Sequence, residues 1–80
     1  MDAQLAAKNG WTFHLTRVGH FYDKRVRGAC YLVVTLPTSA VWLRLDPNGY
    51  VTGGRVTDTP DIALAEADEA SRHPVKTSDD

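Results

Sequence analysis

The chain has 80 residues, a formal net charge of −1 and a hydrophobic fraction of 42%, which suits one small domain with a single core and a shallow functional surface. Cys30 is the only cysteine, so an intrachain disulfide and a cysteine-based zinc site are both excluded. No stretch has the pattern of a secretory signal or the length of a membrane span. We therefore expect one domain over residues 1–80, soluble and cytoplasmic, with no membrane partner.

Charge is divided unevenly along the chain. Seven Lys/Arg stand against three acids before Asp58, and two Lys/Arg stand against seven acids from Asp58 onward. This division suits either a basic body with an acidic appendage or two faces that neutralise each other in the fold. The sequence leaves both alternatives open.

The first third of the chain predicts a short helix and then a strand. Residues 2–8 have helical composition, and Asn9-Gly10 supplies the left-handed residue that commonly ends a helix. Trp11, Phe13 and Leu15 alternate with polar residues, which is the period of a half-buried strand. Gly19 and Asp23 are the expected turn positions in the segment that follows.

Three further strands are predicted in the middle of the chain. Residues 29–36, ACYLVVTL, are apolar on both faces and rich in β-branched side chains, so they predict the central strand. Pro37 ends it, and residues 41–45 alternate in the next strand, with Val41, Leu43 and Leu45 expected to face the core. Residues 46–49, DPNG, predict a hairpin turn, and residues 50–56 predict the return strand, weakened or bulged at its two glycines.

A second helix is predicted to begin at Thr59-Pro60-Asp61. Threonine is a favoured N-cap, proline suits the first helical position, and an acid suits the positive first turn. The predicted fold is an α+β two-layer sandwich: an antiparallel meander sheet of three to five strands with a short N-terminal helix and a C-terminal helix packed on it. Pro74 is expected to end the second helix, and residues 73–80 are expected to form a frayed tail.

The sequence favours a protein that is not an enzyme. His14, His20 and His73 do not have the spacing of metal ligands, and no glycine loop for phosphates, nucleophile elbow or Cys-His arrangement is present. Cys30 lies within the predicted central strand, where a small buried side chain is the expected role. No cofactor and no metal are expected.

One resemblance to an RNA-cleaving family exists. Residues 5–11, LAAKNGW, and then residues 17–22, RVGHFY, are similar to the opening of HicA-type toxins, small RNA-cleaving proteins with a helix, a three-stranded sheet and a second helix. The family has a glycine followed by Ser-His, whereas Gly19 is followed directly by His20, and the chain after Ala29 departs from the family's ending. The resemblance implies that His20 is a catalytic candidate. A surface histidine beside a turn is the favoured alternative.

Residues 17–28, RVGHFYDKRVRG, form a basic–aromatic stretch. Its cations could neutralise phosphates, and either aromatic could stack on an unpaired base. The residues concerned are Arg17, His20, Phe21, Tyr22, Lys24, Arg25 and Arg27. The competing interpretation is a solvated hairpin whose cations deter pairing at a sheet edge. We expect these cations to lie at the rim of a protein interface, so that replacing Lys24, Arg25 and Arg27 by alanine leaves stability nearly unchanged and alters the association rate more than the dissociation rate.

Trp42 and Arg44 predict a protein interface. They alternate with Val41, Leu43 and Leu45, so they should point away from the expected core, and an aromatic–arginine patch is typical of an interface centre. The alternative is that a helix covers their face and makes Trp42 a core residue.

A small protein-binding module is the function that the sequence favours. Its size and lack of motifs resemble accessory inhibitors of phages and plasmids, anti-CRISPR proteins among them. Expected partners are another protein or a nucleic-acid-handling complex, with weak nucleic-acid contact and a homodimer as further options. The alternatives are a module that binds RNA or single strands through residues 17–27 and an RNA-cleaving toxin that uses His20.

Overall fold

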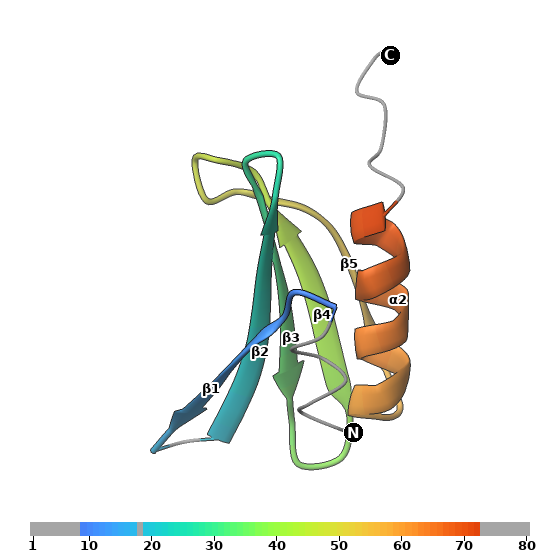
Figure 1. The fold of residues 1–80 in the computed structure, drawn as a ribbon. Helices are drawn as coiled ribbons and strands as arrows, with labels where there is room; N and C mark the ends of the chain where they lie inside the picture. Colours follow the sequence, from blue (N-terminus) through green and yellow to red (C-terminus); the bar gives the residue numbers. More distant parts are fainter. Residues whose placement is uncertain (1–8, 18, 73–80) are drawn as a thin grey trace.

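A computed structural model of the chain describes residues 9–17 and 19–72. It shows a five-stranded antiparallel sheet with one helix on one of its faces (Figure 1). The elements are β1 Thr12–Thr16, β2 Gly19–Val26, β3 Ala29–Thr35, β4 Ala40–Leu45, β5 Val51–Thr57 and α2 Pro60–Arg72. The α+β class is confirmed. The helix predicted over residues 2–8 and the tail predicted over residues 73–80 lie outside the described residues.

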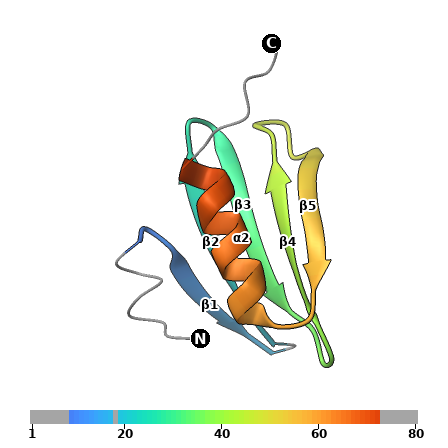
Figure 2. The ribbon, with the colours of Figure 1, turned by 90° about the vertical axis from the view of Figure 1, so that its right-hand side faces the viewer.

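The strands follow one another across the sheet in chain order, β1-β2-β3-β4-β5, so the predicted meander is confirmed and β3 is the central strand (Figure 2). The turn expected at Asp23 is wrong, because Asp23 lies within β2 and pairs with Leu32. The chain turns instead at Arg27-Gly28, where both residues have positive φ, 54° and 84°. Two successive residues of this kind match the twist of the flanking strands in a tight hairpin.

The turn predicted between β4 and β5 is confirmed. The amide of Gly49 donates to the carbonyl of Asp46 at 2.9 Å, and the carboxylate of Asp46 accepts bonds from the amides of Asn48 and Tyr50, each at 2.9 Å. The bulge expected at Gly53 and Gly54 lies one residue earlier, at Thr52. Arg44 pairs with Gly53 and Leu45 pairs with Val51, so Thr52 has no partner on β4. The Asp side chain thus fixes the turn, and the bulge follows it.

Helix α2 begins where the sequence predicts. The hydroxyl of Thr59 accepts a bond from the amide of Ile62 at 3.2 Å, which identifies Thr59 as the N-cap. Ala63 and Ala67 are completely buried, as is Val33 on β3. Because alanine has a short side chain, the helix axis lies close to the sheet, and the core forms between them.

The helix covers the face of the sheet that carries Tyr31, Val33 and Trp42. The expectation that Val41, Leu43 and Leu45 face the core is therefore wrong. Alternation along β4 correctly separates two faces, but both are apolar, so the pattern cannot identify the covered one. The covered face carries Trp42, whose indole N–H donates a hydrogen bond to an acceptor on the helix. An indole N–H that is removed from water needs such an acceptor.

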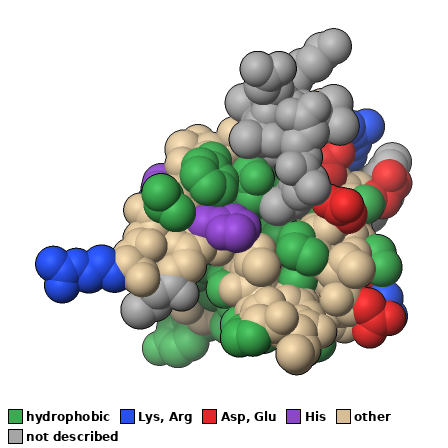
Figure 3. Space-filling model, turned by 90° about the horizontal axis from the view of Figure 1, so that it is seen from below, with side chains coloured by type: hydrophobic (Ala, Val, Ile, Leu, Met, Phe, Trp, Pro, Cys, Tyr) green, Lys and Arg blue, Asp and Glu red, His purple; other side chains and the backbone are tan. Residues whose placement is uncertain are grey.

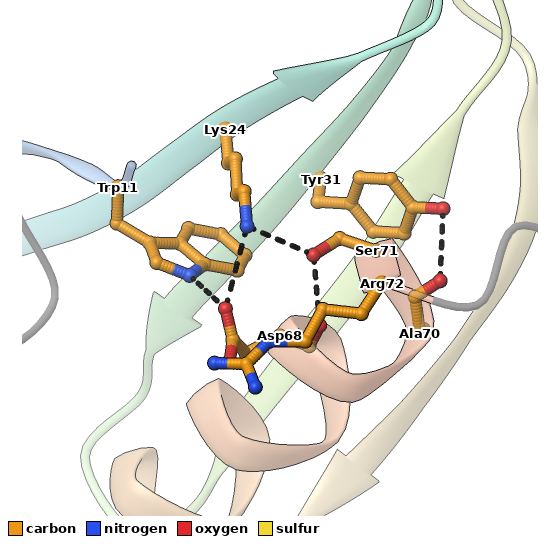
Figure 4. Close-up of polar contacts among 7 residues, drawn as sticks. All are labelled: Trp11, Lys24, Tyr31, Asp68, Ala70, Ser71 and Arg72. Carbon is orange, nitrogen blue, oxygen red and sulfur yellow. Dashed lines mark hydrogen bonds and ion pairs between the residues drawn. The ribbon is translucent and has the colours of Figure 1, made fainter. Parts of the chain in front are cut away.

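Asp68 of α2 is the centre of a polar cluster at the β2 side of the helix (Figure 4). Its Oδ1 accepts a bond from the indole Nε1 of Trp11 at 3.0 Å and lies 3.4 Å from Nζ of Lys24, and its Oδ2 lies 2.7 Å from Nη2 of Arg72. Lys24 also donates to the hydroxyl of Ser71 at 3.1 Å. Partial burial raises the pKa of Asp68, but the bond from Trp11 and the charges of Lys24 and Arg72 together outweigh it and lower the pKa.

Glu66 makes the corresponding contacts at the β5 side of the helix. Its Oε1 accepts bonds from the indole Nε1 of Trp42 at 3.0 Å and from Nε of Arg55 at 2.9 Å, and its Oε2 accepts from Nη2 of Arg55 at 2.6 Å. The hydrogen bond with Arg55 is the main cause that lowers the pKa of Glu66, with the bond from Trp42 next. Each described tryptophan is therefore bound to a carboxylate of α2.

We expect Asp68→Asn to destabilise the fold by about 1–2 kcal/mol at pH 7, because hydrogen bonds to a charged group are worth more than neutral ones. The pKa of Asp68 is lowered in the folded state, so its contribution is complete above the ordinary aspartate value of about 3.9 and is lost as the pH falls through the lowered pKa. Urea unfolding of both proteins from pH 7 to pH 2 measures this. A difference between them that stays constant over that range would contradict it.

Lys24 and Arg25 are neighbours in β2 with side chains on opposite faces, which makes them a matched pair. We expect Lys24→Met to cost about 1–2 kcal/mol, because it removes the hydrogen bonds that Nζ makes to Asp68 and Ser71, whereas Arg25→Met stays within about 0.5 kcal/mol. Urea unfolding at pH 7 measures both. This changes the expectation for Lys24, whose removal was predicted to leave stability nearly unchanged.

Candidate interaction surface

The face of the sheet opposite α2 is apolar over four strands. On β2, β3 and β4 the residues of this face alternate with those that face α2, and the register continues the face onto β5. Within the described residues α2 is the only helix, and it lies on the other side (Figure 1). We call this surface the open sheet face; its apolar residues are Phe21, Cys30, Leu32, Val34, Val41, Leu43, Leu45, Val51 and Val56.

Exposure increases toward the β5 edge of the open sheet face. Val51 and Val56 are 61% and 64% exposed, whereas Leu32 and Leu43 in the centre are half-buried by their neighbours. Val41, Leu43, Val51 and Val56 line a shallow hollow of about 360 Å³, together with residues 53–55. The hollow is thus bordered by branched aliphatic side chains and belongs to β4 and β5.

Gly54 contributes to the hollow because it cannot carry a side chain. Its φ is +146°, and a Cβ built there would overlap the carbonyl oxygen of Trp42. Only glycine adopts this conformation without strain. One row of cross-strand partners crosses the middle of the open sheet face: Asp23, Leu32, Leu43 and Gly54. This row therefore ends at β5 without a side chain.

A polar margin borders the open sheet face on β1 and β2. Nε2 of His14 lies 2.9 Å from Oδ1 of Asp23, and the imidazole stacks on the ring of Phe21 with centroids 4.6 Å apart and planes 14° apart. Arg25 is exposed on the same face, next to Cys30. The margin defined by His14, Asp23 and Arg25 limits the apolar area on one side, as a polar rim does at a protein interface.

The cations predicted for binding are not brought together. Arg17 lies in the turn before β2 and Arg27 in the turn after it, and a strand of eight residues separates them by about 25 Å. Lys24 points to the helix face, where Asp68 and Ser71 hold it, and Arg25 points to the open sheet face. A backbone of phosphates would not meet all four on one surface.

The rings of the same stretch are also divided between the two faces. Tyr22 is only 3% exposed, so it is a core residue and cannot stack on a base. His20 lies on the helix face, with Nε2 3.2 Å from Oγ1 of Thr35 and its ring 5.5 Å from that of Phe13. Phe21 alone of the three lies on the open sheet face, against His14.

Trp42 and Arg44 lie on the helix face, contrary to the expectation that they point away from the core. Trp42 packs against the core and donates to Glu66, and Arg44 binds its own sheet, with Nε 2.9 Å from Oγ1 of Thr52 and Nη2 2.7 Å from its carbonyl oxygen. The apolar side chains missed as surface residues are their neighbours in β4, Val41 and Leu43. Their alternation was the available signal, and only the docking of α2 reveals which face it exposes.

Acidic side chains gather on the helix side of the molecule (Figure 3). Among the four acids of α2, Glu66 is held in the fold by its pairing with Arg55, and Asp68 by its pairing with Lys24 and Arg72. The uneven charge of the sequence is therefore partly neutralised between the helix and the sheet beneath it.

No metal-binding group emerges in the described part of the chain: within residues 9–17 and 19–72, no three His, Cys, Asp or Glu side chains are placed to hold an ion. No helix within those residues is long and apolar enough to cross a membrane.

Comparison with known proteins gives no relative from which a role could be transferred: no family model, no curated protein and no solved structure matches this chain.

Proposed function

We propose that this protein is a non-enzymatic binding module that acts through protein–protein contacts, with the open sheet face as its binding surface. The observation that carries the proposal is the continuous apolar area over β2 to β5, bordered on one side by the polar margin. An apolar centre with a polar border is the usual anatomy of a protein interface. The contact surface predicted from Trp42 and Arg44 is replaced by the opposite face.

The size of the apolar area supports this role. Neighbouring strands are about 4.8 Å apart and residues on one face about 6.7 Å apart, so nine side chains cover a flat area of roughly 300 Å². Contiguous apolar patches of about 300–600 Å² are the largest that monomers usually expose, and they are often functional. The patch is therefore large for a chain of 80 residues.

The nucleic-acid alternative has less support from the geometry. Its cations are separated between two turns and two faces, and one of its two aromatics is buried. The alternative of an RNA-cleaving toxin depends on His20 as the catalytic residue. In the structure this histidine has Thr35 as its hydrogen-bonding neighbour and lies against the rings of Phe13 and Tyr22. The role of an accessory inhibitor stays a prediction.

Val56→Glu tests the proposal, because Val56 is 64% exposed and its replacement changes the open sheet face without disturbing the core. A glutamate buried at an interface without a partner loses its hydration, so we expect capture of the protein partner to weaken at least tenfold, or about 1.4 kcal/mol. Tagged protein is used to capture partners from cells, and binding is then measured with each purified partner.

Leu15→Glu is the matched control. Leu15 is 77% exposed and lies on the helix face of β1, so the same charge is added to the other side of the sheet. Capture should be unchanged in this variant. Capture of RNA that survives Val56→Glu but is lost when Arg25 and Arg27 are both replaced by alanine would favour the nucleic-acid alternative instead.

A further inference from the structure

We infer that the protein bound at the open sheet face is a second copy of this chain, so that two copies pack sheet against sheet about a two-fold axis. The inference rests on the proposed function, since it names the partner of the same surface. Sheets that pack face to face form an aligned sandwich with a core about 10 Å thick. The arrangement of residues on the face, described next, favours self-association.

A two-fold axis parallel to the strands, passing between β3 and β4, makes the apolar area complementary to itself. This rotation places β3 of one copy over β4 of the other and β2 over β5. Each residue of β3 and β4 then lies over the second copy's version of its own cross-strand neighbour. The central facing pairs are Cys30 with Leu45, Leu32 with Leu43, and Val34 with Val41.

The largest side chain of the face meets its hollow under the same rotation. Phe21 on β2 lies in one row with Val34, Val41 and Val56, so it is placed over Val56 of the second copy. Val56 lines the hollow of about 360 Å³ on β4 and β5. Because the axis relates the two copies, this contact of a ring with a hollow is made twice.

Charge also distinguishes this axis from its alternative. Asp23 shares a row with Gly54 and is placed over it, where the absence of a side chain leaves room for the carboxylate and its partner His14. A two-fold axis perpendicular to the strands would place strand β2 over itself and bring the two Asp23 carboxylates together, which is unfavourable. The net charge of −1 opposes association only weakly.

The area sets the expected strength of the dimer. The rotation leaves β1 of each copy beyond β5 of the other, so four strands overlap. Four strands about 4.8 Å apart and six residues of about 3.3 Å each give an overlapping face of roughly 400 Å², and two such faces bury about 800 Å² in total. Specific interfaces usually bury about 1,200–2,000 Å², and smaller ones are weak or transient. We therefore expect a dimer that forms and dissociates in the micromolar range.

Sedimentation velocity over a concentration series into the high micromolar range tests the dimer. The natural protein should pass from monomer to dimer, Val56→Glu should weaken dimerisation at least tenfold, and Leu15→Glu should dimerise normally. Leu43→Glu places the charge at the centre and should abolish the dimer, with circular dichroism confirming that the sheet is retained. A natural protein that stays monomeric at every concentration would overturn the inference.

The native thiol of Cys30 identifies the surface that is used. In the proposed dimer the two Cys30 positions differ by one strand spacing and by the distance between sheets, so their Cα atoms are about 11 Å apart. A short bis-maleimide should give a covalent dimer of the natural protein, none of Cys30→Ser, and much less of Val56→Glu at the same protein concentration. A dimer that is neither cross-linked through Cys30 nor weakened by Val56→Glu uses another surface, and the inference is then wrong.

The two proposals fail separately. If the natural protein is monomeric but Val56→Glu loses a different protein partner, the open sheet face binds protein and only the second copy is excluded. If Val56→Glu affects neither dimerisation nor the capture of any protein, the face is not a binding surface and both proposals fail.

Discussion

Helix α2 is held on the sheet by two indole–carboxylate hydrogen bonds, Trp11 to Asp68 and Trp42 to Glu66, each 3.0 Å long. Residues two positions apart on a helix point to nearly opposite sides, so the two carboxylates reach the sheet on either side of the helix axis. Between them, Ala63 and Ala67 let the helix approach closely. The position of the helix, and therefore the division of the sheet into a covered and an open face, depends on this arrangement.

Several cations of the sheet are held by contacts within the fold. Lys24 belongs to the cluster around Asp68, and Arg55 is paired with Glu66. Arg44 joins β4 to the bulged residue Thr52 and occupies the space above Gly53. A cation that is satisfied by its own fold is less available to a ligand, since the ligand must first replace the contact.

The open sheet face follows from having one helix to cover a five-stranded sheet in the described part of the chain. Antiparallel sheets commonly have one solvated face, which is then polar in alternation. This sheet instead has aliphatic residues on both faces of β3 and β4, and the second set lies opposite the helix. Such a composition suits a surface that is covered in a complex, because water solvates it poorly.

The turn and cap residues determined much of the fold by themselves. Asp46 and Gly49 form one turn, and Thr59 and Pro60 begin the helix. Each acts on residues at most four positions away, through hydrogen bonds and allowed dihedral angles that need no distant partner. The central strand was equally evident, since residues apolar on both faces must be covered on both sides by neighbours or partners. These features are local, so a single sequence contains them in full. The turn at Arg27-Gly28 was missed because a non-glycine residue with positive φ leaves little mark on the pattern.

Only the tertiary structure decided which face of the sheet is the surface. Alternation assigned Val41, Leu43 and Leu45 to one side and Trp42 and Arg44 to the other, and this separation is correct. Hydrophobicity could not rank the two sides, because both are apolar enough to bury. The choice depends on contacts between residues far apart in the chain, 57 positions for Trp11 with Asp68 and 24 for Trp42 with Glu66. Because an indole N–H must keep a hydrogen bond when it is buried, the helix that carries the carboxylates covers the tryptophans and leaves the aliphatic face open.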